Sequence, residues 1–329
     1  MAGWRGGRRA GAVLAVLGGL LAGVVAPGGT GRAAAAGVVQ EVTGFGSNPG
    51  ALRMYRYVPD GLPQGRPVVV AMHGCTQNAA DYGRDSGWIE LADRWGFSVV
   101  LPGQTAANNA NSCFNWFEPG DIRRGSGEAA SIAQMVERQR TDSGASKVYV
   151  TGLSAGGGMT TVMMAAYPES FAGGGVVAGL PYGCAQAAGS PYVCMYVGAS
   201  QSPAQWGDRV RAADPGYGGP WPTLTVVQGT ADTTVKPVNA ADLVEQWTHV
   251  HGADGTADVN DTVGGYPHAV YRDAGGAPVV ETYAITGMGH GQPVDPGTGA
   301  AQCGRAGAYV LDVNLCAAYE VGRGWGLGG

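Results

Sequence analysis

Seven short apolar runs recur along the chain and constrain its fold more than any other feature. They occupy residues 53–59, 67–74, 97–103, 147–152, 174–180, 223–229 and 280–286. Valine-rich runs with little polar alternation are typical of parallel strands that are covered on both faces. Candidate helices lie between them, at residues 85–96, 126–142, 154–169 and 239–252. Strands that alternate with helices predict an α/β layered fold with a mainly parallel sheet.

The first 36 residues predict a secretory signal that is removed before folding. Three arginines precede an apolar, glycine-rich run over 10–26, and the later Ala34-x-Ala36 suits a signal peptidase. An uncleaved membrane anchor is the alternative, but the run is short for a span of about 20 apolar residues. An arginine pair leaves the twin-arginine route open beside the general secretory route. We expect a secreted protein whose single domain covers 37–329, with no later stretch that crosses a membrane.

The charge of the expected mature chain limits its partners. Removing the four arginines of the signal from the 20 basic residues leaves 16, against 25 acidic residues, so the net charge is −9. This balance disfavours nucleic acid and anionic membranes as partners. No repeat, heptad pattern, linker or second module interrupts the sequence, and a chain of this length buries a full core as one unit. We expect one domain that acts as a monomer.

All six cysteines lie in the expected mature chain. An even count in an exported protein predicts disulfides, and neither a C-x-x-C pair nor a cysteine–histidine cluster at zinc spacing indicates a metal site. Sequence proximity suggests two local pairs and leaves one long-range pair, although spacing alone permits fifteen connectivities. The suggested pairs are Cys75–Cys113, Cys184–Cys194 and Cys303–Cys316.

Ser154 lies in a G-x-S-x-G stretch between a predicted strand and a predicted helix. The motif alone is weak, because 59 of the 329 residues are glycine. Its position between a strand and a helix is the one that a nucleophile elbow requires. Gly152 and Gly156 permit a sharp turn that a side chain at either position would block by steric clash. The turn would project the serine at a helix N-terminus, which favours negative charge. The alternative is a glycine-rich turn with an inert serine.

A serine nucleophile needs a histidine base, and the mature chain holds five candidates. His290 is the best of them, because it follows the last predicted strand in a glycine-rich loop. His73 precedes the turn expected to hold oxyanion donors and is predicted to support that turn. The other three are predicted on the surface or in a loop or strand: His249, His251 and His268.

Asp232 is the predicted acid that orients the base. It directly follows the run at 223–229 and falls between Ser154 and His290 in the chain. The order serine, aspartate, histidine is that of the α/β-hydrolases. The alternative for "TAD" is an Asx-type turn after a strand.

Two backbone N–H groups are predicted to form an oxyanion hole. One belongs to Ala155, after the serine, and the other to Cys75 in "HGC", after an early strand. A Cys75–Cys113 disulfide would brace this hole, whereas the alternative for "HGC" is a plain glycine turn. Trp116 in "CFNWF" is either a stacking platform for substrate or a core residue.

Several ordered motifs resemble those of the polyhydroxybutyrate depolymerase-type esterases, a group that overlaps the acetylxylan and feruloyl esterases of carbohydrate esterase family one. They are "HGCTQN", "ANNANSCFNWFEPGDIRRGSGEAASI", "VTGLSAGGGMT", "AGLPYGCA", "QWGDRVRAADPGYGGPWP", "GTADTTVKPVNA" and "GMGH". The resemblance extends from about residue 40 to the end of the chain. It implies an α/β-hydrolase fold, a triad of Ser154, Asp232 and His290, and an oxyanion N–H from Cys75.

Together these features predict a secreted serine carboxylic-ester hydrolase that works through an acyl-enzyme and needs no metal or organic cofactor. The expected substrates are feruloyl or acetyl esters of plant cell-wall polysaccharide such as xylan, because "QWGDRVRAADPGYGGPWP" looks closest to those esterases and no polymer-binding module is seen. A short-chain polyhydroxyalkanoate depolymerase is the alternative. A non-catalytic carbohydrate-binding protein on a hydrolase scaffold is a remote one, disfavoured by the complete triad.

Overall fold

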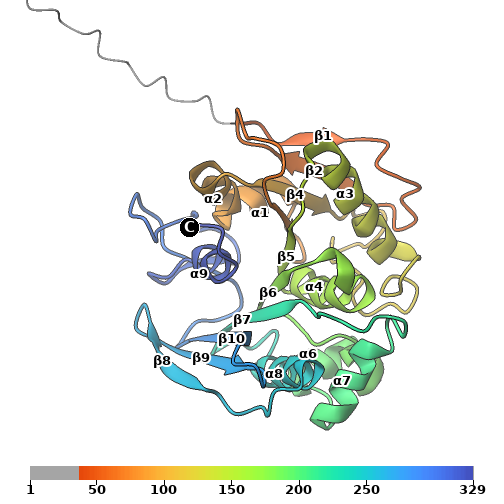
Figure 1. Ribbon diagram of the computed structural model, residues 1–329, viewed down its shortest axis with the longest axis vertical. Coiled ribbons are helices and arrows are strands. Elements are labelled where there is room, and N and C mark those ends of the chain that lie inside the picture. The colour runs from red at the N-terminus through yellow and green to blue at the C-terminus, as the bar shows by residue number, and fades with distance from the viewer. Residues whose placement is uncertain (1–36, 329) are drawn as a thin grey trace, which may run out of the picture. The chain divides into compact units, whose positions relative to one another are not determined.

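A ten-stranded sheet crosses the part of the chain that the computed structural model describes, residues 37–328 (Figure 1). The predicted signal at 1–36 lies outside the described residues. The strands follow one another across the sheet in the order β1 (Gln40–Val42), β2 (Arg53–Tyr57), β4 (Ser98–Gly103), β3 (Val68–Met72), β5 (Val148–Leu153), β6 (Gly173–Val177), β7 (Thr223–Gly229), β10 (Pro278–Ile285), β9 (Tyr266–Arg272) and β8 (Val259–Val263).

The six strands from β4 to β10 in this order are parallel, and antiparallel strands close both edges of the sheet. All seven apolar runs form strands, so the predicted α/β fold with a mainly parallel sheet is confirmed. The edge strands β1 and β8, and β9 next to β8, were not predicted. All three residues in the middle of β8 are exposed, and so that strand lacks the apolar run of a buried one.

Helices cover both faces of the sheet. One face carries α1 (Ala79–Asp85), α2 (Trp88–Trp95) and α9 (Ala317–Gly324), and the other carries α3 (Gly127–Ser143), α4 (Ala155–Ala166), α7 (Pro203–Arg211) and α8 (Val238–His251) (Figure 1). The helices predicted at 126–142, 154–169 and 239–252 correspond to α3, α4 and α8. The candidate at 85–96 corresponds to α2, while α1 and α7 were not predicted.

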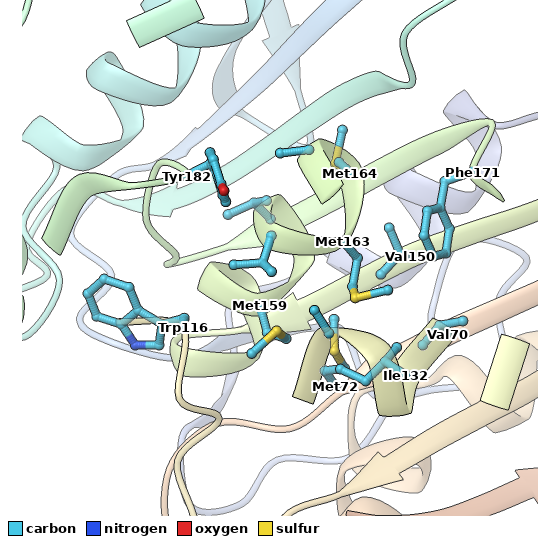
Figure 2. Close-up of a cluster of buried hydrophobic side chains, with 14 of the residues drawn as sticks. Val70, Met72, Trp116, Ile132, Val150, Met159, Met163, Met164, Phe171 and Tyr182 are labelled. Atoms are coloured by element: carbon cyan, nitrogen blue, oxygen red, sulfur yellow. The ribbon is translucent and has the colours of Figure 1, made fainter. Parts of the chain in front are cut away.

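The core on the α4 side is built around a helix that is buried on every side. All twelve residues of α4 are buried, and Met159, Met163 and Met164 lie among side chains from β3, β5 and α3 (Figure 2). Flexible thioether side chains fill irregular gaps of this kind well. Burying each such side chain stabilises the fold by about 1.5–3 kcal/mol, so α4 and the residue that precedes it are held rigidly.

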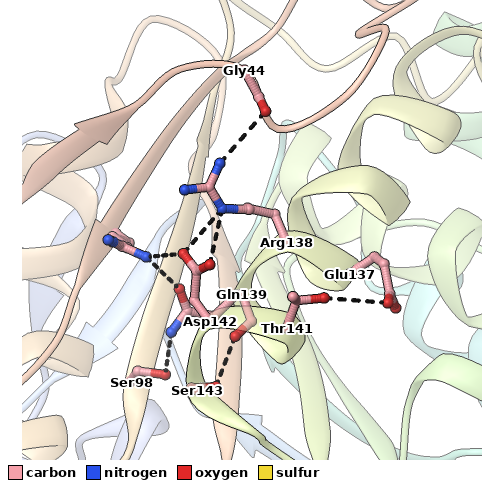
Figure 3. A network of polar contacts seen from close by, with 9 residues as sticks. Gly44, Ser98, Glu137, Arg138, Gln139, Thr141, Asp142 and Ser143 are labelled. Atoms are coloured by element: carbon pink, nitrogen blue, oxygen red, sulfur yellow. Dashed lines mark hydrogen bonds and ion pairs between the residues drawn. The ribbon is translucent and has the colours of Figure 1, made fainter.

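Polar side chains fix α3 against the edge of the sheet. Asp142 pairs with Arg138 one turn earlier and with Arg56 of β2, at 3.0 and 2.6 Å. Gln139 Nε2–H donates to Ser98 Oγ of β4 at 3.1 Å (Figure 3). Half-exposed ion pairs contribute little individually, but the buried Gln139–Ser98 bond fixes the position of α3 along β4.

The two long connections run from β4 to α3 and from β6 to β7. The second contains three helices, α5 (Cys184–Ala188), α6 (Pro191–Val197) and α7. Serine residues cap α6 and α7, and a proline stands at the start of each. These are ordinary helix-start signals, in segments too short to show a clear helical period.

The chain after β10 forms a small parallel sheet of β11 (Gln292–Val294) and β12 (Val310–Asp312) before α9. Within residues 37–328, no helix combines the length and the apolar character needed to cross a membrane.

Candidate active site

Ser154 stands between β5 and α4 in a backbone conformation that side-chain-bearing residues rarely adopt, with φ 57° and ψ −116°. The glycines beside it make this turn possible. A Cβ on Gly152 would overlap the backbone of Gly156, and a Cβ on Gly156 would overlap the carbonyl oxygen of Met72 in β3. The sharp turn places Ser154 at the N-terminus of a buried helix, with its side chain on the wall of a cavity.

His290 and Asp232 reach Ser154 from the ends of two neighbouring parallel strands, β10 and β7. His290 Nε2 lies 2.9 Å from Ser154 Oγ, and His290 Nδ1 lies 2.7 Å from Asp232 Oδ2. A carboxylate only accepts hydrogen bonds, so the proton resides on Nδ1 and leaves Nε2 free to accept from the serine hydroxyl. The three side chains are therefore joined by hydrogen bonds, and His290 is placed to take the proton of Ser154 while Asp232 holds its imidazole.

Asp232 is held by donors other than the histidine. Its Oδ1 accepts from the N–H groups of Thr234 and Val235 at 2.8 and 2.9 Å, and its Oδ2 accepts from Gln228 Nε2–H at 3.2 Å. The Asx-type turn considered from the sequence does form here. The same carboxylate also faces His290, so the turn holds the acid in place.

The cavity beside Ser154 has a volume of about 140 Å³. Cys75, Met195, His290 and Tyr309 are among its lining residues. Neither Cys75 N–H nor Ala155 N–H donates to any acceptor among the described residues. Two free N–H donors next to a serine can donate hydrogen bonds to a ligand oxygen that carries negative charge.

The Cys75 turn is braced from several directions. A disulfide joins Cys75 to Cys113, and Thr76 N–H donates to the Asn111 carbonyl at 2.7 Å. The other two disulfides are Cys184–Cys194 and Cys303–Cys316, and so the three bonded pairs are those suggested by the sequence.

His73 lies directly beneath this turn. It is fully buried; its Nδ1–H donates to the Gly74 carbonyl at 2.8 Å, and its Nε2 accepts from Gln104 N–H at 3.1 Å. Burial lowers the pKa of this imidazole to about 4, so it stays neutral near pH 7. It supports the turn as the sequence indicated and does not reach the cavity.

Glu128, in the first turn of α3, also belongs to this brace. Its carboxylate accepts from Gln104 Nε2–H at 2.5 Å and from Asn115 N–H at 2.8 Å. The neighbouring Arg124 pairs with Glu169, at 2.6 Å, and leaves Glu128 without a cationic partner among the described residues. Burial raises the pKa of Glu128 to about 8. The long connection after β4 therefore folds around a buried carboxyl group, which sequence spacing does not reveal.

Trp116 lies in the core rather than on the cavity wall. Only 6% of its surface is exposed, its ring covers Gly158 of α4, and it meets Phe117 edge to face. Of the two interpretations of Trp116 from the sequence, this position matches that of a core residue.

The three remaining histidines make contacts away from this cavity. His249 contacts Arg211, His251 Nε2 lies 3.0 Å from the Pro222 carbonyl oxygen, and His268 lies between Asp261 and Glu281. His249 and His251 are half-buried, where the sequence suggested a solvated surface.

The sequence did not point to Met195 and Tyr309. Met195 comes from α6, and the Tyr309 ring stands at 73° to the His290 ring with centroids 6.2 Å apart. Both belong to segments whose approach to the site depends on the tertiary fold.

Comparison with known proteins agrees with this geometry. The family model described as Esterase PHB depolymerase matches residues 52–263. Poly(3-hydroxyalkanoate) depolymerase C of Paucimonas lemoignei is 55% identical over 289 residues, which cover 87% of this chain and 70% of that protein. Feruloyl esterase B of Talaromyces funiculosus is 34% identical, over 78% of this chain and 73% of that protein.

A solved structure supports the same fold. The acetyl xylan esterase from Aspergillus awamori has a TM-score of 0.70 and 32% identity, over 77% of this chain and 94% of that chain. The residues matched by the family model include Ser154 and Asp232. The chain therefore belongs to the PHB depolymerase family of esterases, within the α/β-hydrolase fold, and is a carboxylic ester hydrolase.

Proposed function

We propose that residues 37–329 form a secreted serine esterase domain in which Ser154, His290 and Asp232 are the catalytic residues. The observation that carries the proposal is the hydrogen-bonded path from Ser154 Oγ through His290 to Asp232, at 2.9 and 2.7 Å. Ser154 Oγ attacks the ester carbonyl carbon while His290 Nε2 takes the hydroxyl proton. His290 then returns that proton to the leaving alcohol, and the acyl group remains on Ser154. Water repeats the sequence and releases the acid.

Asp232 and two backbone groups complete the mechanism. Asp232 holds the tautomer of His290 that accepts at Nε2 and stabilises the imidazolium formed during each step. The N–H groups of Cys75 and Ala155 donate to the oxyanion of the tetrahedral intermediate. N–H donors that are already in position before the reaction need not be reorganised during it, which saves free energy. The brace beneath Cys75 keeps its N–H in position and so favours catalysis. The reaction so written requires neither a metal nor an organic cofactor.

Export of the protein fits its covalent structure. Three disulfides suit an oxidising compartment, and the sequence of residues 1–36 has the parts of a secretory signal. We infer an extracellular monomer that meets ester substrates outside the cell, with no role for nucleic acid or membrane after the signal is cleaved.

For the substrate we propose a short-chain polyhydroxyalkanoate as the first candidate. This reverses the order expected from the sequence, for two reasons. The identity to a poly(3-hydroxyalkanoate) depolymerase is 55%, against 34% to a feruloyl esterase. The cavity of about 140 Å³ is also smaller than the roughly 300–1,000 Å³ of pockets that enclose drug-sized ligands. A hydroxybutyryl group suits it better than a feruloyl group.

Acetyl esters of xylan are the second candidate. The acetyl xylan esterase from Aspergillus awamori shares the fold at a TM-score of 0.70, and an acetyl group is small enough for the cavity. Feruloyl esters would need their aromatic ring to lie outside it.

A direct comparison of products tests the proposal. The mature protein would be incubated with polyhydroxybutyrate, acetylated xylan and feruloylated arabinoxylan, and released 3-hydroxybutyrate, acetate and ferulate would be measured. We expect 3-hydroxybutyrate to be released fastest, and no product above background from Ser154→Ala. Faster release of acetate or ferulate would contradict the polyester assignment and leave the esterase mechanism in place.

A further inference from the structure

Large apolar side chains are exposed on α6, the short helix that follows the Cys184 segment. Among the described residues, eight large hydrophobic side chains are exposed, and four of them belong to this seven-residue helix. They are Tyr192, Val193, Tyr196 and Val197, here called the α6 surface, with exposures of 66%, 42%, 42% and 68%. Single exposed hydrophobic residues are ordinary, but a group of four on two turns of helix marks an interaction site.

The segment around the α6 surface carries no charge. Residues 170–207 include no Asp, Glu, Lys, Arg or His, although charged residues make up 14% of the chain and about five would be expected in 38 positions. Exposed helices usually carry charged side chains on their solvent face. Because the α6 surface offers no charge to pair with, the partner that suits it is itself uncharged and weakly hydrated.

The α6 surface is held rigidly. Cys194, on the opposite side of the helix, is buried and bonded to Cys184, and Ser190 Oγ accepts from Tyr192 N–H at the helix start. At the other end, the Met195 carbonyl accepts from Lys236 N–H at 2.9 Å and from Asn239 Nδ2–H at 3.1 Å. The apolar side chains are thus presented on a fixed support, which lowers the entropic cost of docking.

The α6 surface is continuous with the catalytic cavity. Met195, in the middle of α6, lines the cavity together with Ser154 and His290. Val238 extends the apolar area, because a Cβ on Gly198, just after α6, would lie 3.0 Å from Val238 Cγ2. Figure 1 places α6 beside α7 and α8, on the α4 face of the sheet. A flat apolar partner resting on α6 would therefore have its edge at the catalytic serine.

We propose that the α6 surface docks the enzyme on the surface of a water-insoluble aliphatic polyester and holds polymer chains over Ser154. The proposal rests on the polyester function above and deepens it. A polyhydroxyalkanoate presents ester groups and alkyl side groups with no charge, which matches valines and the amphipathic rings of tyrosine. Docking next to the cavity raises the effective concentration of ester groups at the serine.

The test compares adsorption with hydrolysis in the mature protein. A Tyr192→Ser/Tyr196→Ser/Val197→Ser variant would be mixed with polyhydroxybutyrate powder, and the protein left in solution would be measured. We expect adsorption to weaken by about 10–100-fold, since three large apolar groups are removed. Hydrolysis of the powder should fall in parallel. kcat/KM for a soluble 3-hydroxybutyrate trimer should stay within about twofold.

Three controls separate the explanations. Val38→Ser replaces an equally exposed valine outside α6, next to β1, and should adsorb like the wild type. Tyr192→Phe/Tyr196→Phe keeps the apolar rings and should retain adsorption. A thermal unfolding curve shows whether the triple variant is folded; if it is not, the single variants Tyr192→Ser and Val197→Ser are measured in the same way.

Undiminished adsorption by a folded triple variant would overturn the α6 proposal. So would a wild-type dimer that the triple variant converts to a monomer, because the α6 surface would then join two copies of the chain. Adsorption to lipid vesicles or xylan but not to polyester would overturn it as well. A wild type that adsorbs to polyester through α6 but releases no 3-hydroxybutyrate would contradict the polyester function and leave the docking surface standing.

Discussion

His290 Nε2 lies 2.9 Å from Ser154 Oγ, although 136 positions separate the two residues in the chain. The serine follows β5 and the histidine follows β10, with β6 and β7 between these strands in the sheet. Contact therefore depends on the loop after β10 turning back over the carboxyl ends of the strands.

Ser154→Ala should abolish esterase activity. We expect kcat/KM for p-nitrophenyl acetate to fall by about 10⁴–10⁶-fold, because Ser154 Oγ is the hydroxyl that is hydrogen-bonded to His290 Nε2 and would form the acyl-enzyme. Labelling by a serine-directed phosphonate should also be lost. Ser200→Ala removes an exposed serine and is the matched control. Retained labelling of Ser154→Ala would show that another serine is the nucleophile.

Asp232→Asn should lower kcat by about 10⁴-fold while the fold is retained, because an amide no longer holds the histidine tautomer that accepts at Nε2. KM should change little. The exposed Asp254→Asn is the control, since that carboxylate only closes a local turn. Steady-state kinetics on a soluble ester measure both constants. A decrease below tenfold would mean that a different group orients His290.

Gly156→Ala should disrupt the serine turn, since its Cβ would overlap the Met72 carbonyl oxygen. We expect a loss of stability of about 1–3 kcal/mol, as for other overpacked sites, together with a large loss of activity. Gly120→Ala is the matched control, because nothing lies within 4 Å of a Cβ there. Urea unfolding and esterase assays on both variants would show the difference. Equal behaviour of the two variants would contradict the account of the turn.

The buried His73 should make stability depend on pH. Its pKa is about 4 in the folded protein and about 6.5 when exposed, so between these values the unfolded chain binds a proton that the folded protein does not. The contribution of neutral His73 to the free energy of unfolding is fully present above pH 6.5 and is lost as the pH falls toward 4. The free energy of unfolding of the wild type should therefore fall between pH 7 and pH 4.5. In His73→Gln this fall should be smaller by about 2–3 kcal/mol. Urea titrations of both proteins at the two pH values measure this. An unchanged difference would show that His73 is not held neutral.

The Cys75–Cys113 disulfide should matter for catalysis more than for stability alone. Removing either this bond or Cys303–Cys316 should cost about 2–4 kcal/mol of stability. Only Cys75→Ala/Cys113→Ala should also lower kcat at temperatures where both proteins are folded, by about 10–100-fold, because it loosens an oxyanion donor. The paired variant Cys303→Ala/Cys316→Ala is therefore the control. Equal kcat values for the two variants would argue against an oxyanion role for Cys75.

The central sheet and the meeting of Ser154, Asp232 and His290 were predictable, because buried parallel strands appear as apolar runs and their carboxyl ends share one edge. The β8–β9 hairpin was not recognised, although Gly264 and Gly265 form its turn at positive φ. A two-residue Gly-Gly turn is a hairpin signal, but the polar strands beside it concealed the pattern.

The lining of the cavity was less predictable than its chemistry. Met195 lies on a helix shorter than the window in which helical periodicity shows, and Tyr309 lies between two short strands near the end of the chain. The Glu128 brace joins residues from the β4–α3 connection and the first turn of α3. Such contacts depend on tertiary packing, which local patterns do not encode.

The register of the sheet has a consequence for how folding can be observed. Met72 is paired with Gly152 between β3 and β5, and Ile285 with Gly229 between β10 and β7. A slip of one residue in either pair would shift a site segment by about 3.3 Å and turn its side chains to the other face. Recovery of esterase activity during refolding therefore reports when both strand pairs have reached their final alignment. Fluorescence or circular dichroism would already register the collapsed chain, so a delay between these signals and activity would measure the time the strands spend correcting their alignment.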